Sequence, residues 1–149
     1  RRTTLEMANV SDPAIADAYN DVRNDKTDTD WALFGYSDSN TIVFKASGSD
    51  GLSGFAAALD DNEAAYGFLR VITGDEESRR AKFVLLSWCG PGVKVLAKAR
   101  MSVHKASVKE IVRDFAVEQH YTDKDEIDAD KLRETVIKAG GANYMGQSA

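Results

Sequence analysis

Apolar residues near the start of the chain recur every three or four positions, which predicts a short amphipathic helix. The recurring positions are Ile15, Ala18, Tyr19 and Val22. Asp12 supplies a carboxylate suited to capping the helix, and Pro13 suits the first helical position. The polar stretch 24–30 ends this helix before the next apolar run.

Four runs of large apolar residues predict two β-hairpins. The predicted strands are 31–36 and 41–46 in the first hairpin, and 65–73 and 81–89 in the second. Asp38-Ser39-Asn40 provides the first turn, and a polar turn around Gly74-Asp75-Glu76-Glu77 joins the second pair. A short helix over 52–59 is expected between the hairpins, after a stretch rich in Gly and Ser.

The last third of the chain predicts two helices. Gly90-Pro91-Gly92 stops the preceding strand, and residues 93–117 contain no Gly or Pro, so one long helix is expected there. A final helix over about 130–139 is expected to close at Gly140-Gly141. This order of elements predicts an α+β domain, with a central sheet of at least four strands covered by helices.

The composition fits one ordinary globular domain. The chain has 149 residues, of which 43% are hydrophobic and 29% charged, and no apolar run approaches the roughly 20 residues that cross a bilayer. Cys89 is the single cysteine and cannot form an internal disulfide, which favours a reducing compartment. Residues 1–6 are interpreted as a cloning remnant, and residues 7–149 as a single domain beginning at Met7.

Net charge disfavours generic nucleic-acid binding. The formal charge is −5, and it becomes −6 without residues 1–6, which carry two arginines and one glutamate. An acidic partner must therefore be met by local clusters of cations.

The predicted long helix carries one such cluster. At 100° per residue, its sheet-facing side comprises Val93, Ala97, Met101, His104, Val108, Ile111, Val112 and Phe115. A neighbouring sector carries Lys94, Lys98, Lys105, Lys109 and Arg113, with no carboxylate between them. Such a stripe is as often a solvated outer face as an interaction surface, but its single sign in an acidic protein favours interaction. His104 lies among apolar positions and is interpreted as a packed core histidine.

A second cluster lies at the second hairpin and the final helix. Arg79, Arg80 and Lys82 stand where the chain enters a strand, and the period of two places Arg80 and Lys82 on one face. Taken alone, these charges are better explained as protection of an edge strand. The final helix adds Lys131, Arg133 and Lys138.

No pattern of residues indicates an enzyme, a cofactor or a metal. Neither His104 nor His120 stands in a nucleophile arrangement with Cys89, and no Gly-rich phosphate loop is present. Asp123, Asp125 and Glu134 imitate part of a calcium loop. A calcium site is rejected because Ile127 replaces an oxygen ligand and Asp128 stands where glycine is needed.

Several local strings from Met7 onward are specific enough to compare with known families. They are Ala18-Tyr19-Asn20-Asp21-Val22-Arg23, residues 31–36, Arg70 with Thr73-Gly74-Asp75, Lys82-Phe83 leading into Ser87-Trp88, and Lys138-Ala139-Gly140-Gly141-Ala142-Asn143-Tyr144. With these strings the chain resembles the coactosins of the actin-depolymerising-factor homology (ADF-H) family. The last string is the most specific, because no generic structural reason would make it recur.

The resemblance implies a gelsolin-like fold with a mixed sheet of five or six strands between helices. It also implies a monomeric, non-enzymatic protein of the cytoplasmic actin cytoskeleton. Such a protein binds the side of filamentous actin, supports growth against capping, does not sever, and binds monomeric actin weakly or not at all.

The family's filament-contacting lysines fall on Lys82 and Lys138, with Arg79 and Arg80 in support. Lys98, Arg100 and Met101 look like the stretch that cofilins use against a monomer, and Lys105 and Lys109 extend it. The residues after Met101 depart from the cofilin pattern.

Two other functions use the same cations. A cofilin-like severing or monomer-binding protein would fragment filaments, whereas an adaptor for anionic lipids or signalling proteins would bind liposomes without actin. An enzyme built around Cys89 and His104 ranks last.

Overall fold

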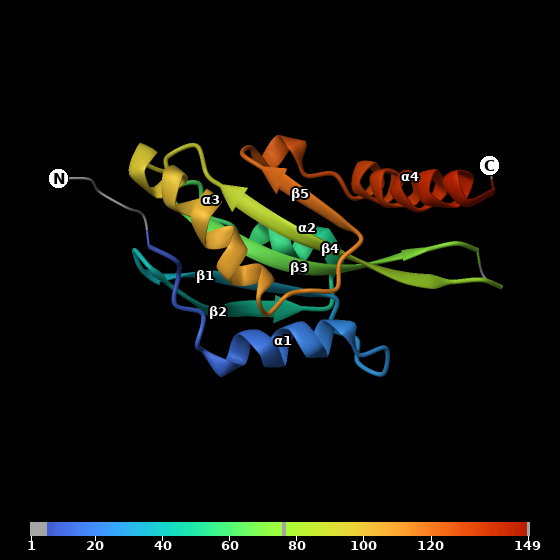
Figure 1. Cartoon of the computed structure of the whole chain (residues 1–149), viewed down its shortest axis with the longest axis horizontal. Helices are drawn as coiled ribbons and strands as arrows, with labels where there is room; N and C mark the ends of the chain where they lie inside the picture. The colour runs from blue at the N-terminus through green and yellow to red at the C-terminus, as the bar shows by residue number, and fades with distance from the viewer. Residues whose placement is uncertain (1–5, 76, 149) are drawn as a thin grey trace.

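The molecule is built from one sheet with helices on both of its faces (Figure 1). The computed structural model describes residues 6–75 and 77–148, with side chains through Gly140. The elements in chain order are α1 (Pro13–Arg23), β1 (Trp31–Asp38), β2 (Thr41–Gly48), α2 (Gly51–Ala57), β3 (Ala64–Thr73), β4 (Arg80–Cys89), α3 (Val95–Lys109), β5 (Val117–Tyr121), the 3₁₀ helix η1 (Lys124–Glu126) and α4 (Ala129–Ser148).

The sheet is mixed and has the strand order β2-β1-β3-β4-β5. Both predicted hairpins form antiparallel pairs, and β1 also pairs antiparallel with β3. β5 runs parallel to β4, because α3 carries the chain back across the sheet between them. The predicted α+β architecture is confirmed, and the five described strands of the mixed sheet agree with the five or six that the resemblance implies.

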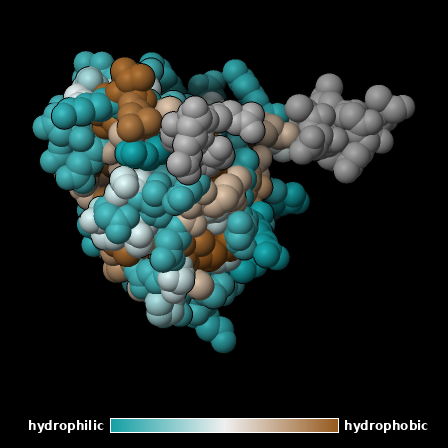
Figure 2. Space-filling model, turned by 60° about the vertical axis from the view of Figure 1, so that its left-hand side comes forward, coloured by the Kyte–Doolittle hydropathy of each residue, from teal (hydrophilic) through white to brown (hydrophobic). Residues whose placement is uncertain are grey.

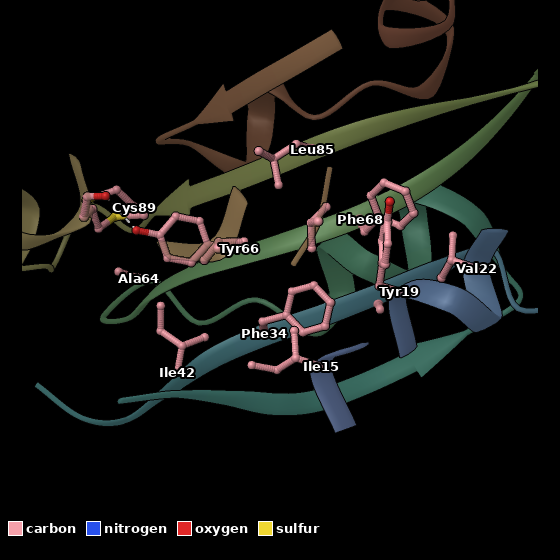
Figure 3. Close-up of a cluster of buried hydrophobic side chains, with 14 of the residues drawn as sticks. Ile15, Tyr19, Val22, Phe34, Ile42, Ala64, Tyr66, Phe68, Leu85 and Cys89 are labelled. Carbon is pink, nitrogen blue, oxygen red and sulfur yellow. Dashed lines mark hydrogen bonds between the residues drawn. The ribbon is translucent and has the colours of Figure 1, made fainter. Parts of the chain in front are cut away.

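Alternating strand residues build two apolar cores, one on each face of the sheet. The first contains Tyr66 and Phe68 of β3 and is covered by α1 and α3 (Figure 3). There the ring centroid of Tyr19 from α1 lies 4.8 Å from that of Phe68. The second contains Leu69 of β3 and Trp88 of β4 and is covered by α2 and α4. Each face of the sheet therefore has its own pair of helices.

Helix α1 begins as the sequence predicts. The Asp12 side chain accepts a hydrogen bond from the backbone N–H of Ala14 at 3.0 Å, and Pro13 follows it. The loop after α1 is fixed by Arg70 on β3, whose guanidinium donates to the carbonyl oxygens of Asn24, Thr27 and Thr29. This arginine ties the segment between α1 and β1 to the sheet.

The prediction of one helix over 93–117 is wrong. α3 ends at Lys109, where Glu110 and Ile111 make bonds of i→i−3 type that tighten the last turn. The chain then turns, and the backbone N–H of Ala116 donates to Phe83 O at 2.8 Å, which starts the pairing of β5 with β4. Leaving the helix lets β5 satisfy the backbone groups on the free edge of β4.

The expected glycine cap of the last helix is also wrong. α4 continues through Gly140 and Gly141 to Ser148. Among the described residues, positive φ angles occur at Gly51 and Gly74, so Gly140 does not adopt the left-handed conformation of a cap. A Cβ at Gly140 would meet nothing within 4 Å, so the surroundings of this helical position do not require glycine. Within the described part of the chain, no helix is both long and apolar enough to cross a membrane.

Candidate functional site

Cations of the second hairpin and of α4 form the first candidate surface. We call Arg79, Arg80, Lys82, Arg133 and Lys138 the hairpin–α4 surface. The outer part of the β3–β4 hairpin extends beyond the neighbouring strands, toward the end of the molecule at which α4 also ends (Figure 1). Elements separated by about fifty residues in sequence thus carry their cations to one end of the molecule.

Lys82 lies on the face of the sheet that α4 covers. It pairs with Val71, and Val71 packs against the core that contains Val84 of β4 and Val136 of α4. The alternation of β4 gives Lys82 and Arg80 the same orientation as Val84. The predicted period of two therefore directs both cations to the α4 side.

Arg133 ties α4 to the hairpin. Its Nε donates to the backbone carbonyl of Ile72 at 3.1 Å. β1 pairs with β3 only as far as Leu69, so the carbonyl of Ile72 lies on a part of β3 that β1 does not cover. Lys138 lies five residues after Arg133, about 140° farther around the helix axis. Arg133 therefore positions the helix that presents Lys138.

The cations of the hairpin–α4 surface face solvent, and within residues 6–75 and 77–140 they form no ion pair. Lys138, Arg79 and Arg80 are exposed, and Lys82 is half-buried. Among the described residues, the ion pairs join Arg23 to Asp114 and Glu118 to two lysines of α3, and none includes this surface. Glu134 precedes Lys138 by one turn of α4 without pairing with it.

One carboxylate of the turn, that of Asp75, is used within the hairpin. Asp75 Oδ1 accepts from the backbone N–H groups of Glu77 and Ser78, at 3.0 and 2.9 Å. These bonds hold the pKa of Asp75 below its ordinary value, the backbone bond from Ser78 being the largest cause. Asp75 stabilises the turn that displays Arg79 and Arg80.

The cation stripe predicted on the long helix is shorter than expected, and a carboxylate interrupts it. Lys94 precedes α3 and Arg113 follows it, so Lys98, Lys105 and Lys109 remain on the helix. Glu118 of β5 approaches Lys105 at 3.8 Å and also pairs with Lys109. This pairing is not predicted from the sequence, because no strand is expected at Glu118.

The residues that resemble the monomer-binding segment of cofilins lie in different surroundings. Met101 is buried at 6% exposure, and its carbonyl accepts a hydrogen bond of 2.7 Å from Tyr66. Lys98 and Arg100 line two different hollows on opposite sides of α3. The three side chains therefore do not form one continuous surface.

His104 is a core residue, as predicted. It is fully buried, and its Nε2–H donates to the Glu6 carbonyl at 2.9 Å, so Nδ1 accepts from the Tyr36 hydroxyl at 2.8 Å. Burial is the main cause that lowers the pKa of His104. This side chain anchors α3 to β1 and to the segment that precedes α1.

One of the carboxylates that imitate a calcium loop, that of Asp123, caps η1. Asp123 Oδ1 accepts from the backbone N–H of Asp125 at 2.8 Å, while Glu126 Oε1 accepts from those of Thr122 and Asp123. This reciprocal arrangement is a capping box. The oxygens of Asp123 and Glu126 are therefore engaged in local structure.

An exposed apolar pair at the start of α3 was not anticipated from the sequence. Val95 is 81% exposed and Leu96 54%. Figure 2 shows apolar surface on the end of the molecule that contains the start of α3. The helical period did carry a signal, since at 100° per residue neither Val95 nor Leu96 falls on the predicted sheet-facing side.

The family of the chain is decided by a match over most of its length. Residues 7–137 match the model of the family described as cofilin/tropomyosin-type actin-binding protein. The chain belongs to this family of actin-binding proteins. The expectation of a non-enzymatic, ADF-H protein is thereby confirmed.

Individual relatives have the same overall length and fold. Coactosin of Dictyostelium discoideum is 44% identical over 144 residues, which cover 96% of this chain and 99% of the relative. The crystal structure of coactosin from Entamoeba histolytica has a TM-score of 0.82 at 32% identity, covering 90% of this chain and 97% of that one. Mouse coactosin, an actin filament binding protein, has a TM-score of 0.75 at 38% identity, covering 95% and 99%.

Proposed function

We propose that this protein binds the side of actin filaments through the hairpin–α4 surface. The observation that carries the proposal is a set of cations on two converging elements, without an ion pair among the described residues, in a protein of net charge −5. Such a surface suits a negatively charged polymer, because local charge can overcome an unfavourable net charge. The mouse relative, which binds filaments, adds support from the family.

Lys82 and Lys138 are the proposed principal contacts, with Arg79 and Arg80 in support. Lys82 is half-buried, so its stem is held against the sheet while its ammonium group reaches solvent. Exposed ion pairs contribute about 0–1 kcal/mol each and more once desolvated, so several must act together. Binding should therefore weaken as salt rises.

We extend the proposal to the consequence of binding, which is support of filament growth against capping without severing. The protein would act in the cytoplasm, at the actin cytoskeleton, as a monomer. Burial of Met101 and the pairing of Glu118 with α3 reduce the surface available to grip an actin monomer. Weak or absent monomer binding follows from this argument.

Co-sedimentation with filaments at low and moderate salt tests the proposal. Lys82→Glu and Lys138→Glu should each lose most of the binding of the wild type. Lys45→Glu reverses an exposed lysine on the edge strand β2, which β1 and β3 separate from β4, and serves as the matched control. Full retention of binding by both Lys82→Glu and Lys138→Glu would refute the site.

A second candidate function is monomer binding or severing through α3. The exposed Val95 and Leu96 favour it, since an apolar pair beside Lys94 and Lys98 is suited to a protein interface. Fluorescence microscopy of single filaments separates the two functions, because a severing protein fragments them and a side-binder leaves their number unchanged. Val95→Ser should leave filament pelleting unchanged if the hairpin–α4 surface is the principal site.

A further inference from the structure

A hollow of about 570 Å³ lies between α3 and the strands beside it, away from the hairpin–α4 surface. Its floor is buried and consists of Tyr66, Ser87, Cys89 and Met101. Its rim is formed by the turn at Pro91, by side chains of α3, and by His120 and Thr122 beyond the edge of β4. The volume falls within the range of small-molecule sites, which is about 300–1,000 Å³.

The charged residues in the described lining of this hollow are all positive. Lys98 and Lys105 stand on its rim, and its described lining contains no aspartate or glutamate. The second hollow beside α3 has a similar volume, about 600 Å³, but it contains Asp38 and Glu63 as well as cations. Outside the rim, Glu118 approaches Lys105 at 3.8 Å, so Lys98 is the less compensated of the two lysines.

A buried serine and an exposed histidine place a further donor at the rim. Ser87 is 5% exposed, and its Oγ lies 2.6 Å from Nδ1 of His120. Ser87 Oγ has no other partner among the described residues, so its proton is satisfied only if Ser87 donates to Nδ1. His120 then carries its own proton on Nε2, on the side of the ring away from Ser87.

The lowered pKa of His120 agrees with this tautomer. Burial is the largest cause, and the charge of Lys105 acts in the same direction, whereas Glu126 opposes them. At neutral pH the ring is therefore uncharged and Nε2–H remains a donor. An apolar floor thus stands beside two ammonium groups and a ring N–H.

We propose that this hollow is a binding site for small organic anions that have an apolar body and a single anionic group. The apolar body would pack on Met101 and Tyr66, and the anionic group would lie between Lys98, Lys105 and Nε2–H of His120. Such a ligand matches both the cationic rim and the apolar floor, whereas a cation or a neutral sugar matches neither. The site is separate from the proposed filament contacts.

Fluorescence titration with 1-anilinonaphthalene-8-sulfonate tests the proposal, because its emission rises in an apolar environment. The neutral comparison probe is N-phenyl-1-naphthylamine, which has the same rings without the sulfonate. Saturable one-to-one binding of the sulfonate is expected, at least tenfold tighter than that of the neutral probe. Equal affinity for the two probes would overturn the role of charge.

Two variants and one control locate the bound sulfonate probe. Lys98→Ala should weaken its binding at least fivefold, and Ser102→Phe should abolish binding by filling the rim, where Ser102 is exposed and its Oγ donates to Ala99 O. Lys94→Ala removes the same charge from the second hollow and should change nothing. Thermal unfolding of each variant verifies that the fold is intact.

Amide chemical-shift perturbation in the wild-type protein gives an independent location. The sulfonate probe should shift amides of 87–91, 98–105 and 120–122. Perturbations confined to the second hollow, or equal binding by Lys98→Ala and Lys94→Ala, would overturn the proposal. Neither experiment uses filaments, so the result is separate from that of the filament assay.

Discussion

Two cationic regions of this protein contain the same residue types but differ in their intramolecular partners. On α3, Lys105 and Lys109 share Glu118 of β5. On the hairpin–α4 surface, Lys82 and Lys138 form no ion pair within the described residues. A cation already paired within the protein gains less from an external carboxylate, because its present interaction must first be lost. The two regions are therefore distinguished by whether their lysines are already paired with a carboxylate, and not by the number of lysines.

Reversing the charge of both principal contacts, Lys82 and Lys138, should produce the largest loss of filament affinity. The double variant Lys82→Glu, Lys138→Glu is expected to bind filaments roughly a hundredfold more weakly, since each reversal replaces attraction by repulsion worth about 1.4 kcal/mol. Quantitative pelleting measures the change. Unaltered thermal unfolding is the control for folding. A loss below threefold would place the principal contacts elsewhere.

Lowering the pH should destabilise the packing of α3 without affecting the hairpin–α4 surface. The pKa of His104 is lowered in the folded protein, so stability is fully present above its unfolded pKa of about 6.5 and falls as pH decreases below that value. The unfolded chain then binds a proton that the buried ring does not, at a cost of up to about 1.4 kcal/mol per pH unit.

Urea unfolding between pH 7.5 and 5.5 measures this dependence, and amide hydrogen exchange shows where it acts. His104→Gln keeps a donor and an acceptor without a titrating ring, so its stability should depend less on pH. His120 also has a lowered pKa and contributes to the residual slope. An identical slope in His104→Gln and the wild type would contradict the assignment.

Loss of the hydrogen bond between Arg133 of α4 and Ile72 of the hairpin should have an intermediate effect on filament affinity. Arg133→Gln removes the bond to Ile72 O together with one charge, and filament affinity should fall roughly fivefold. Lys131→Gln removes one charge from the same helix without such a bond and should change affinity less than twofold. Equal effects of the two substitutions would show that Arg133 acts through charge alone.

Removing the carboxylate partner of the α3 lysines should have the smallest effect on filament affinity. Glu118→Gln frees Lys105 and Lys109, whose side chains are 36% and 39% exposed. Stability should change by less than about 0.5 kcal/mol, and filament affinity should rise about twofold. Glu110→Gln is the control, because Glu110 is exposed at the end of α3. A change in filament affinity for Glu118→Gln that is larger than the loss caused by any substitution in the hairpin–α4 surface would reverse the comparison between the regions.

Local sequence patterns predicted most of the fold, while pairing between distant segments was harder to predict. The two hairpins are predicted by apolar runs and turn residues, and α1 by its helical spacing and the Asp12 cap. β5 was missed because its alternation spans only Val117–Tyr121 and no Gly or Pro separates it from α3. Its existence depends on the free edge of β4, which the sequence of β5 does not specify.

In the candidate site too, local sequence patterns predicted some features, while others depended on contacts between distant segments. The orientation of Lys82 follows from the period of two in β4, so the sequence was sufficient to predict it. The pairing of Glu118 with α3 required β5, and the bond from Arg133 to Ile72 required the relative position of α4 and the hairpin. Whether a charge is available thus depended on contacts between residues far apart in sequence.

Filament affinity of Lys82→Glu and Lys105→Glu, measured side by side by pelleting at one salt concentration, tests the central claim most directly. The two substitutions change the net charge equally, but only Lys105 has a carboxylate partner among the described residues. Lys82→Glu should lose at least tenfold in affinity and Lys105→Glu less than threefold. An equal or greater loss in Lys105→Glu would contradict the account.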